Sequence, residues 1–144
     1  DKQVLSEGWM IRSVDADTLD MQALSREKPE SNAHWMKVDQ MPKQVAEVLL
    51  QHGKIPDPRI GRNASKCTWV WEKDWVYATR FKTPDGKGPA FLRFMGVDTE
   101  ASVFLNGALI ESAPAERLVV SAGRHELRCV DGAGRAAAVR FTVR

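Results

Sequence analysis

CTWVWEKDWVYATRF, from Cys67 to Phe81, is the stretch that decides the fold. If the whole stretch were extended, alternate positions from Trp69 onward would project to one face. These positions hold five aromatic residues together with a lysine and a threonine: Trp69, Trp71, Lys73, Trp75, Tyr77, Thr79 and Phe81. Such an aromatic stripe is either the face of a core or a platform for a ring-shaped ligand such as a sugar.

The second half of the stripe is best explained as a core face. Residues 75–82 are rich in β-branched and aromatic residues, so we expect them to form a strand. A sheet buries one face, and the period of two then places Tyr77 and Phe81 inside while Arg80 and Lys82 face solvent.

Trp69 and Trp71 leave two interpretations open. They follow a loop rich in Pro and Gly and share their segment with Glu72, Lys73 and Asp74. This mixture could stack on a pyranose ring while the carboxylates accept hydrogen bonds from its hydroxyl groups. Large aromatic residues also commonly pack in a core or between domains. Both sugar contact and packing are therefore considered for this pair.

The remaining patterns predict a mainly β fold with one short helix. The helix is expected near residues 42–52, with Pro42 at its start, apolar residues at helical spacing and Gly53 as its stop. Asn106-Gly107 predicts a type I′ hairpin, because both residues tolerate positive φ. Strands are expected from about Trp9, in HWMKVD, and at residues 75–82, 90–94, 101–105, 117–120, 125–130 and 138–143. Short strands at such spacing favour a β-sandwich.

Composition narrows the classes of partner. The 144 residues suit one domain, and 21 basic against 19 acidic residues give a net charge of +2. We therefore expect no nucleic-acid partner. No apolar run reaches membrane-spanning length, so we expect no membrane partner. Cys67 and Cys129 are more simply two free buried thiols than one bridge.

Two quoted segments resemble a known enzyme family. GKIPDPRIGRNASKCTWVWEKDWVYATRF and FLRFMGVDTEASVFLNG are similar to the amino-terminal domain of β-mannosidase-like enzymes of glycoside hydrolase family 2. The resemblance covers roughly residues 8 to 110. It implies a jelly-roll, galactose-binding-like β-sandwich that packs against the catalytic and β-sandwich domains of a parent enzyme, with mannose-containing glycans as candidate ligands.

The resemblance implies no catalytic residue in this chain, because the family's two catalytic carboxylates lie on a barrel. The candidate carbohydrate contacts are Arg59, Asn63, Trp69, Trp71, Glu72 and Asp74. Glu72 and Asp74 could also suggest a glycosidase pair. On one strand, however, they would point the same way about 7 Å apart with no evident pocket. We therefore assign them no catalytic role.

No cofactor or metal is expected. His34, His52 and His125 are scattered, and the spacing of Asp15, Asp17 and Asp20 lacks the glycine and terminal Glu of an EF-hand. Asn63 begins an Asn-Ala-Ser glycosylation pattern, which matters only in a eukaryotic secretory route.

The resemblance ends soon after Asn106-Gly107. Residues 112–144 weakly resemble the closing β-domain of bifunctional penicillin-binding proteins, so the chain either joins two ancestries near residues 107–114 or has a divergent tail. In both cases we expect residues 1–144 to form a single domain, because a tail of this length cannot bury enough apolar surface alone.

Overall fold

The strands form two antiparallel sheets. The computed structural model describes residues 3–14, 33–41, 43–83, 90–94, 101–110, 117–120, 123–131 and 141–143. The four-stranded sheet has the order β1 (Gln3–Leu5), β10 (Phe141–Val143), β5 (Ala90–Phe94) and β8 (Arg117–Val120). The six-stranded sheet has the order β3 (Met36–Val38), β2 (Trp9–Val14), β4 (Asp74–Lys82), β9 (Arg124–Asp131), β6 (Ala101–Leu105) and β7 (Ala108–Ile110).

The mainly β class and most of the strand predictions are confirmed. The expected final strand at 138–143 is observed as Phe141–Val143, and residues 132–140 lie outside the described part. β1 was not predicted, because its three residues carry no pattern of their own. They become a strand by pairing with β10, which joins Leu5 to Phe141 and Gln3 to Val143.

The core lies on one face of the central strands β2, β4 and β9 and includes Leu5 of the other sheet. Tyr77 and Phe81 of β4 are buried, whereas Arg80 and Lys82 are exposed. The predicted register of this strand is therefore correct at all four positions. The aromatic residues of β4, Trp75, Tyr77 and Phe81, therefore lie in the core.

The opposite face of β4 is not fully exposed to solvent, as a strict alternation of buried and exposed residues would require. Val76 and Ala78 are also buried, and they form a second cluster with Trp35. Met10 and Phe104 from the neighbouring strands pack against this cluster. The first half of β4 is thus covered on both faces, which a period-two pattern cannot predict.

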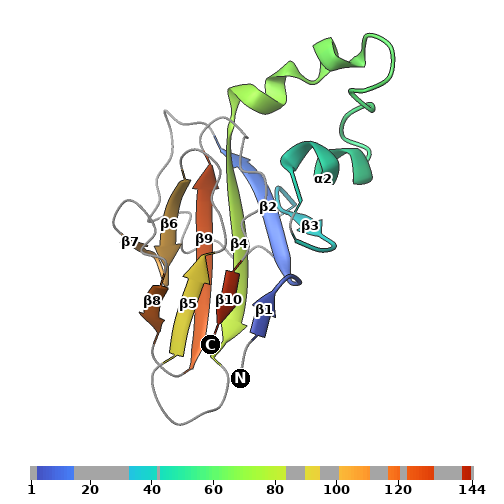
Figure 1. The fold of residues 1–144 in the computed structure, drawn as a ribbon. Helices are drawn as coiled ribbons and strands as arrows, with labels where there is room; N and C mark the ends of the chain where they lie inside the picture. Colours follow the sequence, from blue (N-terminus) through green and yellow to red (C-terminus); the bar gives the residue numbers. More distant parts are fainter. Residues whose placement is uncertain are drawn as a thin grey trace.

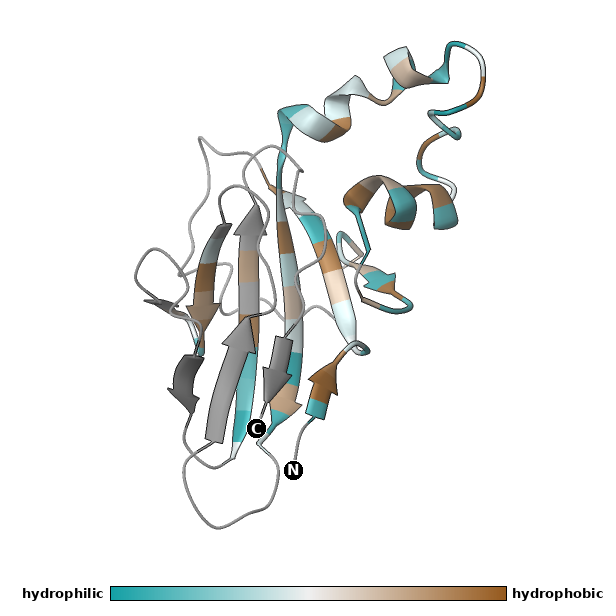
Figure 2. Cartoon of the chain, viewed as in Figure 1, coloured by the Kyte–Doolittle hydropathy of each residue, from teal (hydrophilic) through white to brown (hydrophobic). Residues whose placement is uncertain are grey.

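Helix α2 (Val45–Gln51) confirms the predicted helix. Its buried residues are Val45, Val48 and Leu49, and Figure 2 shows a mainly hydrophobic ribbon interrupted by hydrophilic bands. Glu47 caps the first turn by accepting a 2.8 Å hydrogen bond from the backbone N–H of Gln44. At the other end Gly53 takes a φ of 67°, which ends the helix as predicted.

The helix is tied to the large sheet by polar contacts. The Tyr77 hydroxyl of β4 donates to the carbonyl of Lys43 at 3.2 Å. Nε2 of His52, just after the helix, lies 2.7 Å from the carbonyl oxygen of Lys37 in β3. Figure 1 shows α2 beside β3, with the following chain continuing beyond the end of β4.

The carboxyl-terminal third supplies central strands to both sheets. β9 lies between β4 and β6, and β10 lies between β1 and β5. The β4–β9 pairing runs from Trp75 opposite Asp131 to Lys82 opposite Arg124. Each sheet therefore combines strands from before and after the proposed seam. The single-domain assignment itself stays a prediction.

Candidate functional site

Five of the six sequence-predicted sugar contacts lie on one segment, residues 54–73, which we call the arm, and the sixth, Asp74, is the first residue of β4. The arm connects α2 to β4 and contains two short 3-10 helices, η3 (Asn63–Lys66) and η4 (Thr68–Glu72). Figure 1 shows the arm standing away from the strands at the end of β4. Its shape is fixed by internal contacts, which begin at Asp57.

Asp57 is the hub of the first half of the arm. Its side chain accepts hydrogen bonds from the backbone N–H and Nε of Arg59, both at 3.0 Å, and from Nη2 at 2.9 Å. The bond to the backbone N–H two residues on is an Asx turn. The Arg59 side-chain hydrogen bonds hold the pKa of the Asp57 carboxyl below its usual value. Asp57 and Arg59 thus form one rigid, forked pair.

Asn63 and Cys67 fasten the start of the arm to its helical half. Nδ2 of Asn63 donates to the backbone carbonyl of Asp57 at 3.1 Å. Sγ of the buried Cys67 lies 3.3 Å from the carbonyl oxygen of Asn63 and 3.6 Å from that of Pro56, so its one S–H can donate to either carbonyl. These bonds give Asn63 a structural role within the arm.

Trp69 and Trp71 separate because their segment is helical. A 3-10 helix has about three residues per turn, so side chains two positions apart point to different sides. Trp69 is half-buried, and its ring centroid lies 6.2 Å from that of Trp75. Trp71 is 42% exposed. The aromatic stripe of β4 therefore does not continue through the residues before Lys73. Of the two tryptophans in η4, Trp71 presents the larger open surface.

Trp75 marks the change from 3-10 helix to strand. Its Nε1 donates to the carbonyl of Val70 at 2.8 Å, and both residues are buried. Lys73, between the two elements, has the extended dihedrals φ −113° and ψ 152°. The position of the η4 helix is therefore coupled to the sandwich core.

Glu72 and Asp74 do not form the same-strand pair that their spacing suggested. Glu72 is the exposed last residue of η4, whereas Asp74 is the half-buried first residue of β4 and pairs with Val14. The change of backbone conformation between them removes the common direction that two residues of one strand would share.

The structure thus joins Arg59 and Asn63 through Asp57, places Trp71 and Glu72 on the exposed end of η4, and turns Trp69 inward. The prediction that Cys67 is a free buried thiol is confirmed. Sequence reasoning missed the contacts that Asp57 and Cys67 make within the arm. The Asp-Pro dipeptide at residues 57–58 is a turn signal that could have identified the first. A buried thiol that ties two loop turns has no comparable signature.

The described residues contain no group of three or more His, Cys, Asp or Glu side chains placed to hold a metal ion. Asp15, Asp17 and Asp20 lie outside the described residues. No helix in the part of the chain that the structure describes is long and apolar enough to cross a membrane.

Comparisons with known proteins identify one enzyme family. Residues 9–115 match the sequence model of the family described as "Glycosyl hydrolase 2 galactose-binding domain-like". The chain is 38% identical over 109 residues to β-mannosidase B of Thermothelomyces thermophilus, covering 74% of this chain and 11% of the relative. It is 36% identical over 111 residues to β-mannosidase B of Emericella nidulans, covering 76% and 12% respectively.

Solved structures show the same fold. A β-D-mannosidase from Dictyoglomus thermophilum superposes with a TM-score of 0.68 at 24% identity, covering 92% of this chain and 16% of that one. The exo-chitosanase CsxA of Amycolatopsis orientalis gives a TM-score of 0.75 at 18% identity, covering 100% of this chain and 20% of its own. The chain spans only about a tenth of the length of the β-mannosidases it matches.

Proposed function

The chain belongs to the family of glycosyl hydrolase 2 galactose-binding-like domains, and from that membership we propose that it is a sugar-binding accessory domain of a β-mannosidase-like enzyme. What it matches is the amino-terminal, non-catalytic domain of such enzymes. The proposed role is to support or extend a glycan site that lies on another domain of the parent.

The observation that carries the proposal is the exposed indole of Trp71 in η4, where the arm joins β4. An aromatic face can stack on a pyranose ring, and Glu72 beside it offers carboxylate oxygens to hydroxyl groups. Because Asp57, Asn63 and Cys67 fix the arm internally, little conformational entropy is lost when it meets a ligand. An ordered segment that is anchored to the core through Cys67 and Val70, yet exposes Trp71, suits contact with a site outside this domain.

The accessory role is tested in the complete enzyme proposed as parent. We expect Trp71→Ala to raise KM for manno-oligosaccharides about tenfold, the effect of losing one stacked ring, with a smaller change for an aryl mannoside. Val4→Ala is the matched control, because Val4 is 55% exposed on β1. Equal KM values for wild type and the Trp71 variant would refute sugar contact through this residue.

The same proposal predicts that the chain alone has no glycosidase activity. Turnover of an aryl β-mannoside by the pure chain, lost in Glu72→Ala or Asp74→Ala, would contradict it. Titration of the chain with manno-oligosaccharides, followed by tryptophan fluorescence, separates an accessory domain from an autonomous carbohydrate-binding module. Saturable binding of the oligosaccharide, with fluorescence quenching that Trp71→Ala abolishes, would favour the autonomous module.

Ile60 favours a second candidate function, a docking domain. It lies on the same arm as Trp71 and is 62% exposed, so two large apolar side chains of this one segment face solvent. If the arm docks against another protein domain, Ile60→Asp should weaken that association while leaving KM unchanged in the associated fraction. If Trp71 instead contacts the sugar, Trp71→Ala should raise KM more than Ile60→Asp does.

A further inference from the structure

We infer that the sugar contact proposed at Trp71 is one end of a longer site, and that this site binds an oligosaccharide carrying an anionic group. The other end of the site is Arg62, which lies on the same exposed row of the arm. The inference rests on the proposed accessory function and deepens it by naming the class of substrate.

The side chains of the helical half of the arm follow a period of three. In 3-10 turns, side chains three residues apart lie over one another. One row is buried and contains Cys67 and Val70, which belong to the core. Another row is exposed at every position and consists of Arg62, Ser65, Thr68 and Trp71. The arm therefore lines up a cation, two hydroxyl groups and an indole on one exposed side.

The three-residue repeat continues across the junction of η3 and η4. Cys67 caps both helices. Its backbone N–H donates to the carbonyl of Ala64, and its own carbonyl accepts from the backbone N–H of Val70, both at 3.1 Å. Arg62 and Trp71 are three such turns apart, which corresponds to about 18 Å along a straight 3-10 helix. A ligand that reaches both residues is therefore longer than a single sugar ring.

The two hydroxyl groups of the row hold its backbone and can still bind a ligand. Oγ of Ser65 donates to the carbonyl of Arg62 at 2.8 Å, and Oγ1 of Thr68 donates to the carbonyl of Ser65 at 3.3 Å. A hydroxyl group has one donor and two lone pairs, so both oxygens can accept hydrogen bonds from sugar hydroxyl groups. These bonds order the row before a ligand arrives, which reduces the cost of binding.

The charge of the arm favours an anionic ligand. Residues 54–73 contain five basic and two acidic residues, so this segment alone exceeds the net charge of +2 of the whole chain. The carboxylate of Asp57 is engaged by Arg59 at 2.9 Å. Arg62 and Lys66 are exposed and make no ion pair within the described residues. Their charges therefore remain available to attract an oxyanion on a ligand.

The two ends of the row differ in chemistry, which sets the direction of the ligand. Glu72 follows Trp71 and is exposed, so its carboxylate repels an anion at that end while it can accept from neutral sugar hydroxyl groups. The Arg62 guanidinium can pair with a carboxylate or a phosphate through two parallel hydrogen bonds. We therefore place a neutral sugar ring on Trp71 and the anionic group of the same oligosaccharide at Arg62.

The test uses two forms of mannotetraose that differ in charge at the reducing end. Oxidation of that end gives the aldonate, which carries a carboxylate, and reduction gives the neutral alditol with the same open chain. In the complete enzyme proposed as parent, we expect KM for the aldonate to be about tenfold lower than KM for the alditol, the effect of one charge-assisted hydrogen bond. Equal KM values for the two substrates in the wild-type enzyme would overturn the inference.

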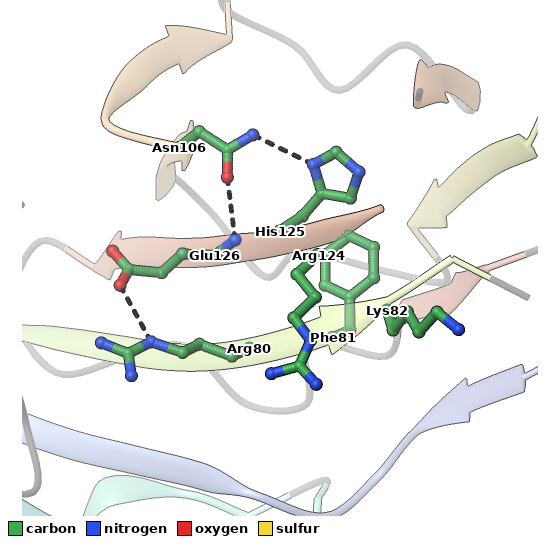
Figure 3. A pocket seen from close by; sticks show the side chains of 7 residues that line it. All are labelled: Arg80, Phe81, Lys82, Asn106, Arg124, His125 and Glu126. Atoms are coloured by element: carbon green, nitrogen blue, oxygen red, sulfur yellow. Dashed lines mark hydrogen bonds and ion pairs between the residues drawn. The ribbon is translucent and has the colours of Figure 1, made fainter. Parts of the chain in front are cut away.

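The double variant Arg62→Gln, Lys66→Gln should bring the ratio of the two KM values to about one, because it removes both cations. The matched control is Arg124→Gln, Lys37→Gln, which removes one exposed arginine and one exposed lysine outside the arm. Arg124 lies opposite Lys82 at the end of β4 far from the arm, as Figure 3 shows. The control should keep the wild-type ratio, and equal melting temperatures should show that both double variants are folded.

A wild-type ratio in the Arg62→Gln, Lys66→Gln enzyme would also overturn the inference, because the anion would then be bound elsewhere. The alditol keeps this test separate from that of the accessory function. If Trp71→Ala raises KM for the alditol but the wild-type enzyme does not prefer the aldonate, the accessory function stands and the anionic substrate class is wrong.

Discussion

Nδ2 of Asn106 lies 3.0 Å from Nδ1 of His125, and this contact selects one tautomer of the neutral ring. The Asn106 amide is oriented by its Oδ1, which accepts from the backbone N–H of Glu126 at 2.9 Å. The amide nitrogen must then donate, so Nδ1 of His125 accepts and the neutral ring carries its proton on Nε2. Asn106 also has a φ of 52° and turns the β6–β7 hairpin. One residue therefore shapes the turn and fixes it to β9.

Replacing Asn106 should separate these two roles. Asn106→Gly keeps a residue that tolerates positive φ but loses both side-chain bonds, so we expect about 1–3 kcal/mol less unfolding free energy. Asn106→Ala should lose about 1–2 kcal/mol more, because alanine is strained in that conformation. Urea unfolding of the three proteins measures both differences. A glycine variant as stable as wild type would show that the contacts with His125 and Glu126 contribute nothing.

Phe81 and Lys82 provide a matched test of the β4 register. Phe81 is 5% exposed, and Phe81→Ala should cost about 3–5 kcal/mol from lost transfer free energy and the cavity left behind. Lys82 is exposed, and Lys82→Ala should change stability by no more than about 0.5 kcal/mol. Similar destabilisation by both substitutions in denaturant melts would contradict the assigned faces.

Deleting residues 112–144 tests whether the chain is one domain. The deletion removes β8, β9 and β10, so β4 and β6 lose the strand between them and β1 loses its partner. Unpaired edges and uncovered apolar faces favour aggregation. We expect an unfolded or insoluble remainder, and a single cooperative thermal transition for the intact chain. A soluble remainder that melts as the intact chain does would show that the tail is merely appended.

The arm should loosen in acid. Its hydrogen bonds to Arg59 give Asp57 a folded-state pKa below the ordinary value of 3.8. A lowered pKa contributes stability that is complete above the unfolded-state pKa and is lost as pH falls through the folded-state pKa. The arm should therefore be fully ordered at neutral pH and lose order below about pH 3.8. Trp71 fluorescence follows this change, and Asp57→Asn should remove its pH dependence. If Asp57→Asn shows the same acid transition as wild type, then the transition is caused by a titrating group other than Asp57.

The two cysteine thiols should be inert in the folded protein. Cys67 and Cys129 are free and buried, and burial raises the pKa of the Cys129 thiol. Because the thiolate is the reactive form, a thiol-specific reagent should label neither residue in native buffer. Both should react once denaturant unfolds the chain. Rapid labelling of Cys129 in native buffer would mean that β9 opens far more readily than a central strand should.

Local sequence patterns determined the elements whose signals are themselves local. The period of two fixed the faces of Tyr77, Arg80 and Phe81 on β4, because neighbouring side chains of a strand must alternate. Gly53 and the Asn106-Gly107 pair marked a helix end and a hairpin, since both conformations need positive φ. The quoted motifs also identified the family that the comparison over residues 9–115 later confirmed.

Tertiary structure decided everything that depends on long-range contacts. β1 forms because Leu5 meets Phe141 at the far end of the chain, and Val76 is buried because Trp35 packs near the second face of β4. Trp69 and Trp71 point apart because their backbone is a 3-10 helix, whose conformation is coupled to the core through the Trp75 bond to Val70. Pairing across distant segments fixes these features, and no periodicity within a short stretch encodes which distant segment will meet it.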